Sequence, residues 1–263
     1  RKVPTLSSPR IETGVKLNFY NGVGGFSEDG KEYVITMNEE TWTPMPWINV
    51  IANAEFGCLV TESGAGYSYS LNSRENQLTP WSNDPVSDTP GEVFYLRDET
   101  TGNYWTPTAL PVRGRGTYTV RHGQGYSVFE HTSEEIRTTL TQFVPLEESL
   151  KISRLRLENL SSRSRTLSLT AYQEWILGFT GSTSATQLVS EYDAETGALF
   201  VSNPLNHEFG SRIAFVVLDE LQDFTTDRSE FLGRHGSLAN PVVLETRNTL
   251  SSKLGAGHDP CTV

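Results

Sequence analysis

Apolar and polar residues alternate along much of the middle of the chain. In the stretches 167–171 and 213–217, apolar side chains recur two residues apart, which is the periodicity of strands with one buried face. The stretches 117–120, 126–131 and 138–143 are rich in β-branched and aromatic residues, which also favours strands. Because short segments with Gly, Asn or Ser separate these stretches, the middle of the chain is predicted to form an antiparallel meander.

Helical periodicity is scarce in the sequence. Only the stretch 229–235 has a pattern that fits one or two helical turns. The chain has 263 residues, and β sandwiches often reach about 250 residues as a single domain. Since no repeat or low-complexity linker divides it, residues 1–263 are predicted to form one all-β domain with two large, packed antiparallel sheets and little helix.

Composition and charge narrow the possible partners. The formal net charge of −11 argues against nucleic acid, whose phosphates require clustered Lys and Arg. No apolar run approaches the roughly 20 residues that a membrane-spanning helix needs. Cys58 and Cys261 form neither a CxxC pair nor a cluster with histidine, so two free thiols are expected rather than a zinc site.

Catalytic chemistry finds little support in the residues. None of the five histidines stands at a metal-ligand spacing, so no metal and no cofactor are expected. Glycoside chemistry would need two carboxylates placed across a sugar, and no pair stands out among the acidic residues near turns or aromatics. The candidates considered are Glu62, Glu75, Asp84, Asp88, Glu92 and Glu174. No catalytic residue is therefore assigned.

The segment 72–92, "NSRENQLTPWSNDPVSDTPGE", interrupts the strand-like sequence with three prolines and many polar side chains. Proline and Asp/Asn disfavour a central strand, so a long loop is predicted. An aromatic ring can stack on the C–H face of a pyranose while polar groups bind its hydroxyls. The candidate sugar-binding residues are Arg74, Glu75, Asn76, Trp81, Asn83 and Asp84. Equally, Trp81 would close the end of the sandwich while the polar residues cap turns.

The stretch 52–108, which includes this loop and the tetrapeptide "YLRD", resembles the N-terminal β-sandwich of glycoside hydrolase family 94. The segments "NGVGGFSEDGKEYVI", "ENLSSRSRTLSLTAYQEWILG" and "GAGHDPC" extend the resemblance over nearly the whole chain. It looks closest to the version found in bacterial cyclic β-1,2-glucan synthases, and the group includes the cellobiose and chitobiose phosphorylases.

The resemblance implies a galactose-mutarotase-like supersandwich that packs against an (α/α)6 barrel. In that family the barrel carries the catalytic acid and the phosphate site, and it would follow residue 263. The chain is therefore expected to be a non-catalytic fragment, inactive alone, whose loop 72–92 helps to shape a sugar cleft. Implied partners are a β-glucan or oligosaccharide, the barrel of the same chain and a possible homodimer. The implied location is the cytoplasmic face of the bacterial inner membrane, within a membrane-bound enzyme.

Two other functions remain open at this point. An independent carbohydrate-binding module would be favoured by an exposed Trp81. A mutarotase-like enzyme would require two of His122, His131 and His207 beside a carboxylate in one cleft. A large apolar patch where the barrel would dock would instead favour the non-catalytic domain.

Overall fold

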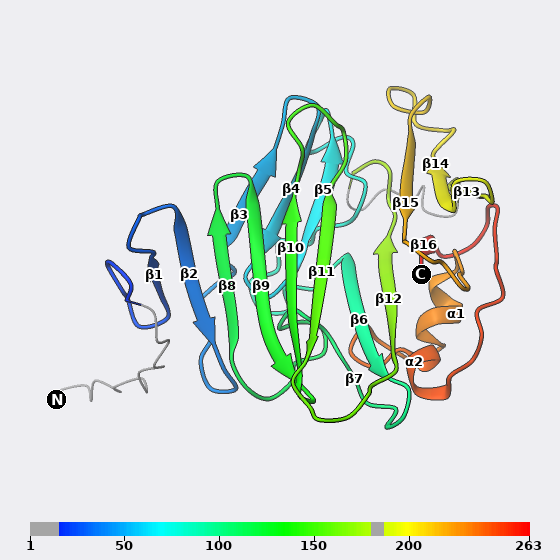
Figure 1. The fold of residues 1–263 in the computed structure, drawn as a ribbon. Coiled ribbons are helices and arrows are strands. Elements are labelled where there is room, and N and C mark those ends of the chain that lie inside the picture. Colours follow the sequence, from blue (N-terminus) through cyan, green and yellow to red (C-terminus); the bar gives the residue numbers. More distant parts are fainter. Residues whose placement is uncertain (1–15, 180–186) are drawn as a thin grey trace, which may run out of the picture.

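The computed structural model describes residues 16–179 and 187–263, and almost all of their regular structure is antiparallel β-sheet (Figure 1). The strands are β1 (Gly24–Phe26), β2 (Glu32–Met37), β3 (Ile48–Ala52), β4 (Phe56–Thr61), β5 (Gly66–Ser70), β6 (Glu92–Asp98), β7 (Tyr104–Trp105), β8 (Tyr118–Gly123), β9 (Tyr126–Ser133), β10 (Ile136–Phe143), β11 (Ile152–Asn159), β12 (Leu167–Glu174), β13 (Val189–Asp193), β14 (Ala198–Ser202), β15 (Ile213–Val217) and β16 (Cys261–Thr262). The helices in this part of the chain are α1 (Arg228–Leu232) and α2 (Val242–Thr246).

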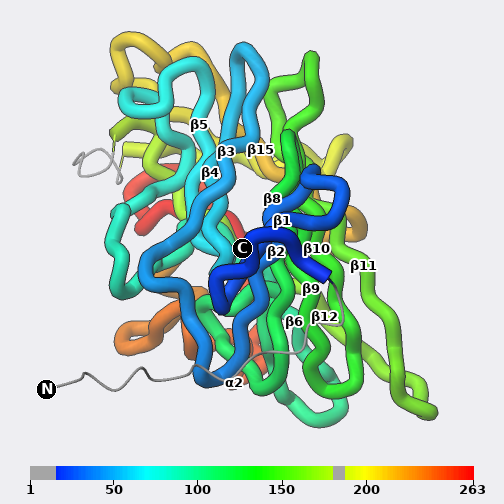
Figure 2. Tube along the Cα trace, turned by 90° about the vertical axis from the view of Figure 1, so that its left-hand side faces the viewer, coloured from blue at the N-terminus to red at the C-terminus, as the bar shows by residue number. Residues whose placement is uncertain are grey.

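The strands form four sheets that are arranged in layers. A six-stranded sheet has the order β1-β2-β8-β9-β10-β11, and a three-stranded sheet has the order β3-β4-β5. Figure 2 shows β3, β4 and β5 as a layer beside the one that contains β8 to β11. The sheets β16-β12-β6-β7 and β13-β14-β15 continue the molecule beyond β11, toward the C-terminus (Figure 1).

The main hydrophobic core lies between the six-stranded sheet and β3–β5. Alternate residues of these strands point inward, as the two-residue period requires. The largest contributors include Ile35 and Met37 from β2, Ile51 from β3 and Phe129 from β9, all at most 1% exposed. A second cluster surrounds Phe231 of α1, which is fully buried.

The prediction of a mostly β, antiparallel fold with very little helix is confirmed. The predicted stretches 126–131 and 138–143 correspond to β9 and β10, which pair in continuous register. The helical stretch 229–235 corresponds to α1, whose first turn is capped by the side chain of Asp227. The sequence did not predict α2, because its residues "VVLET" include two β-branched valines.

Cys58 and Cys261 are both free and buried. None of the helices in the ranges 16–179 and 187–263 is long and apolar enough to cross a membrane.

Candidate functional site

The middle of the loop 72–92, around Trp81, folds back over the outer face of the β3–β5 sheet. Val50, Leu59 and Tyr67 are directly opposite one another on the three strands, so their side chains share one face. This face points away from the main core, which receives the alternate residues of β3 and β4. Trp81 stacks on Tyr67 with a centroid separation of 5.3 Å and an interplanar angle of 12°. Its ring is therefore half-buried against the sheet.

Buried hydrogen bonds fasten the loop at both ends. Asn76 is 3% exposed, and its side-chain amide donates to the carbonyl of Ser70 at 3.0 Å. Asp88 is 8% exposed and accepts from the hydroxyls of Thr61, at 2.7 Å, and Ser63. Because buried polar groups that lose such partners are costly, these contacts fix the course of the loop from within this domain.

Arg74 and Glu75 lie at the exposed beginning of the loop. The backbone amides of both residues donate to the side-chain oxygen of Asn72, which forms a tight turn. Their side chains form an ion pair at 3.2 Å, and the Arg74 side chain is 87% exposed. Since exposed ion pairs contribute little to stability, both charged groups remain accessible to a ligand.

Asn83 and Asp84 lie at a second turn of the loop. Asp84 accepts hydrogen bonds from the Ser87 hydroxyl at 2.7 Å and from the Val86 amide at 2.9 Å, and these bonds lower the pKa of its carboxyl group. Asn83 is exposed and has a φ of 50°, a conformation that asparagine tolerates. The capping role considered for Asp84 is thus present, while sugar binding by these residues remains a prediction.

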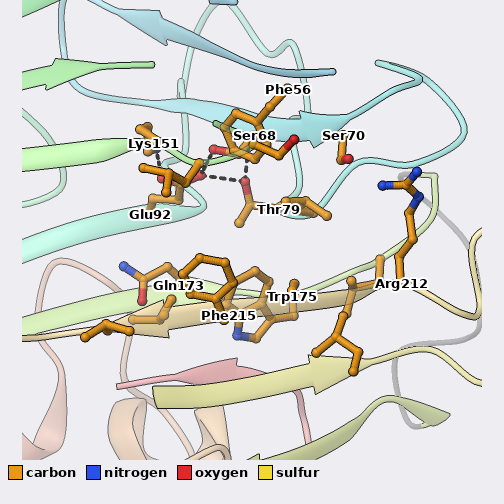
Figure 3. Close-up of a pocket in the computed structure, with 18 of the residues that line it drawn as sticks. Phe56, Ser68, Ser70, Thr79, Glu92, Lys151, Gln173, Trp175, Arg212 and Phe215 are labelled. Atoms are coloured by element: carbon orange, nitrogen blue, oxygen red, sulfur yellow. Dashed lines mark hydrogen bonds and ion pairs between the residues drawn. The ribbon is translucent and has the colours of Figure 1, made fainter. Parts of the chain in front are cut away.

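The described residues also enclose a pocket of about 550 Å³. It lies on the inner face of β4 and β5, between these strands with the segment 149–153 on one side and β12 with β15 on the other (Figure 3). Of the six predicted sugar-binding residues, only Asn76 lines it. Both ends of the segment 72–92 also contribute lining residues, namely Leu78, Thr79 and Glu92. The part of the loop around Trp81, which stacks on Tyr67, instead lies on the outer face of the sheet.

One side of this pocket, which we call the polar wall, consists of Ser68, Thr79, Glu92 and Lys151. Lys151 forms an ion pair with Glu92, and the carboxylate also accepts from the hydroxyls of Ser68 at 2.7 Å and Thr79 at 2.8 Å. Burial raises the pKa of Glu92, but the Lys151 charge and these hydrogen bonds outweigh it and hold the pKa below its ordinary value. Both side chains of the pair are therefore charged at neutral pH.

The opposite side, the apolar wall, consists of Trp175, Ile213, Phe215 and Val217. The last three belong to alternate positions of the edge strand β15 and are 62%, 46% and 56% exposed. Trp175 is buried, and its indole N–H donates to the Thr262 hydroxyl at 2.6 Å. Half-exposed large side chains in regular alternation leave an uncovered apolar surface facing the polar wall (Figure 3).

Two further polar side chains border the pocket. Gln173 on β12 has a buried side-chain oxygen without a hydrogen-bond partner among the residues that the structure places. Arg212 is exposed at one end of the pocket (Figure 3), and within the described ranges it forms no ion pair. An unpartnered acceptor and an exposed donor group thus border the pocket.

Sequence reasoning did not bring these pocket residues together. In the sequence Glu92 is one of several carboxylates near turns, and no motif distinguishes Lys151. Lys151 stands between Leu150 and Ile152, and this position could have indicated a buried ion pair. A lysine that is buried among aliphatic residues is almost always paired with an acidic group. Phe215 was identified only as part of a strand.

The histidines do not form the constellation that a mutarotase-like enzyme would need. The hydrogen bonds found for His122 and His131 in the described structure go to the Ser127 hydroxyl and the Thr117 carbonyl. His207 is exposed in the segment between β14 and β15. Over residues 16–179 and 187–263 there is also no group of three or more His, Cys, Asp or Glu that could hold a metal ion.

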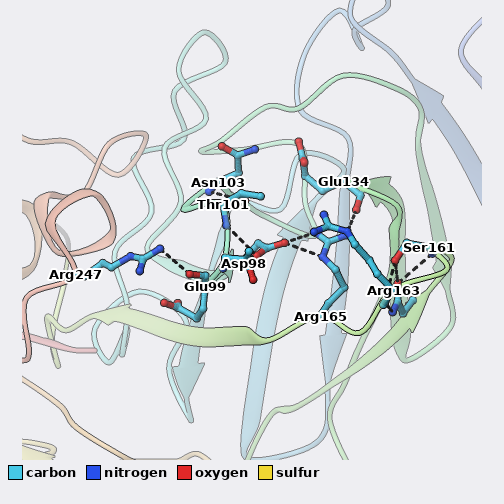
Figure 4. Close-up of polar contacts among 11 residues, drawn as sticks. Asp98, Glu99, Thr101, Asn103, Glu134, Ser161, Arg163, Arg165 and Arg247 are labelled. Carbon is cyan, nitrogen blue, oxygen red and sulfur yellow. Dashed lines mark hydrogen bonds and ion pairs between the residues drawn. The ribbon is translucent and has the colours of Figure 1, made fainter.

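The "YLRD" segment has a structural role at the end of β6 (Figure 4). Asp98 is fully buried and forms an ion pair with Arg165, whose Nε lies 2.7 Å from the carboxylate. Arg97 donates to the carbonyl of Leu244 at 2.8 Å and pairs with Glu99. These contacts tie β6 to the start of β12 and to α2, away from the pocket.

Comparisons with known proteins agree with this architecture. A family model described as "Glycosyl hydrolase 94, supersandwich domain" matches residues 31–263. The chain is 39% identical over 250 residues to the cyclic beta-(1,2)-glucan synthase NdvB of Rhizobium meliloti (strain 1021), covering 94% of this chain and 9% of that protein. It is 31% identical over 231 residues to the N,N'-diacetylchitobiose phosphorylase of Vibrio furnissii, covering 84% of this chain and 28% of that protein. The chain thus spans less than a third of either relative.

Proposed function

Because this chain belongs to the supersandwich domains of glycosyl hydrolase family 94, we propose that it is the non-catalytic sandwich of a larger enzyme acting on β-glucan. In this proposal the enzyme is of the cyclic β-1,2-glucan synthase type, a glycosyltransferase/phosphorylase-type enzyme. The domain shapes the sugar cleft of an adjoining (α/α)6 barrel, where phosphate cleaves the glucan by phosphorolysis. The names of the relatives, a glucan synthase and sugar phosphorylases, support the substrate class. The chain covers only a small share of each relative, which supports the proposal that the catalytic residues lie in another domain of the enzyme.

The observation that carries the proposal is the construction of the loop 72–92. Buried contacts of Asn76 and Asp88 fix the loop, whereas Arg74, Glu75 and Asn83 are exposed on it. Binding residues are commonly placed on loops that a rigid scaffold positions. Such a loop can present polar side chains to a sugar held mainly by another domain.

An apolar margin beside the loop supports docking of that second domain. Ile48 and Val50 on the edge strand β3 are 48% and 55% exposed and share the outer face of the sheet with Tyr67. Contiguous exposed apolar side chains are typical of interaction surfaces. The proposal further places the enzyme in the bacterial inner membrane with this domain on the cytoplasmic face, where phosphate and nucleotide sugars occur.

The test uses the full-length protein that contains this domain and a linear β-1,2-glucan as substrate. Arg74→Ala is expected to lower kcat/KM for phosphorolysis at least about tenfold, which corresponds to one hydrogen bond to a charged donor. The matched control is Arg137→Ala, which removes another exposed arginine from an ion pair, on β10. If Arg74→Ala and Arg137→Ala have equal kcat/KM, the loop does not contribute to the sugar cleft.

A further inference from the structure

We infer that the pocket between the polar wall and the apolar wall is a second sugar site, which binds a neutral β-glucosyl oligosaccharide independently of Arg74 and of the outer-face part of the loop, residues 81–87. The ligand class rests on the proposed function, whereas the position and the residues of the site come from the pocket itself. Its volume of about 550 Å³ falls within the range of about 300–1,000 Å³ that is typical of small-molecule sites.

The two walls differ in a way that matches a pyranose ring. A β-glucosyl unit carries its hydroxyls around the rim and presents apolar C–H groups on its faces. Phe215, 46% exposed, offers an accessible aromatic surface for such a face, and Ile213 and Val217 extend that surface along β15. The polar wall lies opposite Phe215 (Figure 3), so hydroxyls on the rim of a stacked ring would reach it.

The polar side chains retain unused hydrogen-bonding capacity. The ammonium group of Lys151 has three donors, and its contact with Glu92 uses one of them. The side-chain oxygen of Gln173 is buried without a partner in the described structure. Because a sugar hydroxyl both donates and accepts, a single class of ligand group can satisfy both of these side chains.

Arg212 adds a donor group at the end of the pocket. Its guanidinium carries five N–H donors in a planar fork and is exposed. A sugar chain that extends out of the pocket would pass this side chain, which can bind neighbouring hydroxyls. A site lined on one side by apolar groups and closed by a few convergent polar groups is the usual form of a ligand pocket.

A purely apolar polypeptide segment is a poorer match for the same space. It would cover the apolar wall, but it would offer no hydrogen bonds to the remaining donors of Lys151 or to the side-chain oxygen of Gln173, which lacks a partner in the described structure. Leaving buried polar groups unsatisfied costs about 1–3 kcal/mol per group, and more for charged groups. The polar wall therefore favours a hydroxyl-bearing occupant.

The experiment is a calorimetric titration of the 263-residue chain with sophorose, the β-1,2-linked glucose disaccharide, and with longer linear β-1,2-gluco-oligosaccharides. Saturable binding is expected, and Phe215→Ala is expected to weaken it at least tenfold. Phe26→Ala is the matched control, because Phe26 is 44% exposed and lies on β1, in a different sheet. Circular dichroism of each variant checks that the fold is retained.

Three results would overturn the inference. In the first, the titration detects no binding at tens of millimolar sugar. In the second, the sugar binds, but Phe215→Ala leaves its affinity unchanged. The third is binding abolished by Trp81→Ala but not by Phe215→Ala, which would place the sugar on the loop. None of these results depends on catalysis by the full-length protein, so this site and the proposed role of the loop 72–92 can fail separately.

Discussion

Tyr67 and Ser68, consecutive residues of β5, point to opposite faces of the same three-stranded sheet. Tyr67 supports Trp81 and the loop 72–92 on the outer face, whereas Ser68 donates to Glu92 in the inner pocket. The two-residue period of a strand thus connects both candidate sites to one short segment. A one-residue shift in the register of β5 would exchange the two faces and disrupt both sites.

The stack between Trp81 and Tyr67 should stabilise the loop. We expect Trp81→Ala to lower the free energy of unfolding by about 1–3 kcal/mol, since it removes the stacking and part of the buried ring area. Urea denaturation measures this change, and limited proteolysis should show faster cleavage within the loop. Tyr67→Phe keeps the stack and serves as the control; an equal loss of stability in this variant would contradict the assignment.

The ion pair between Glu92 and Lys151 should be much more sensitive to mutation than a surface pair. We expect Lys151→Met to lower the free energy of unfolding by about 3–5 kcal/mol, because it leaves the Glu92 charge buried without its partner. Combining it with Glu92→Gln should recover much of that loss. Arg137→Met, at the exposed pair with Glu158, should cost less than about 1 kcal/mol. Similar values for the two single variants would show that the pocket pair is solvated.

The domain should lose stability in mild acid partly through His122. Burial lowers the pKa of its imidazole to about 4, below the unfolded value of about 6.5. The unfolded chain therefore binds the proton first as the pH falls. The stabilising contribution is complete above pH 6.5 and declines toward pH 4, by about 3 kcal/mol in total. Chemical denaturation across this range should show a shallower pH dependence for His122→Gln, and an unchanged slope would contradict the assignment.

The start of β5 depends on a glycine. Gly66 has a φ of 143°, and a Cβ at this position would lie 1.9 Å from the carbonyl oxygen of Leu59. Gly66→Ala should therefore destabilise the domain more than the backbone cost of about 1–2 kcal/mol that a positive φ imposes on alanine. Gly125→Ala is the control, since Gly125 has a φ of 84° and open space around it. Thermal unfolding that ranks the two variants equally would exclude a steric role for Gly66.

The regular strands were the most predictable part of this protein. Alternating apolar residues identified β12 and β15, and β-branched and aromatic content identified β8 to β10, because these patterns reflect one buried face of each strand. The helix α2 was missed because its contacts with α1 and the core around Phe231 override the strand preference of its valines.

The sites were less predictable than the strands because they depend on which distant segments meet. The sequence predicted that residues 72–92 form a polar loop with one tryptophan. It did not predict that Trp81 packs on Tyr67 or that the buried Asp88 carboxylate accepts a hydrogen bond from Thr61. It also gave no indication that Lys151 would meet Glu92 across 59 positions of the chain. Such pairings follow from the packing of sheets, which local periodicity does not specify.

The most direct test of the central claim compares the isolated 263-residue chain with the full-length protein for phosphate-dependent release of glucose 1-phosphate from a linear β-1,2-glucan. The account predicts release by the full-length protein and none by the isolated chain at equal molar concentration. Release by the isolated chain would show that these residues contain a catalytic site of their own and would contradict the account.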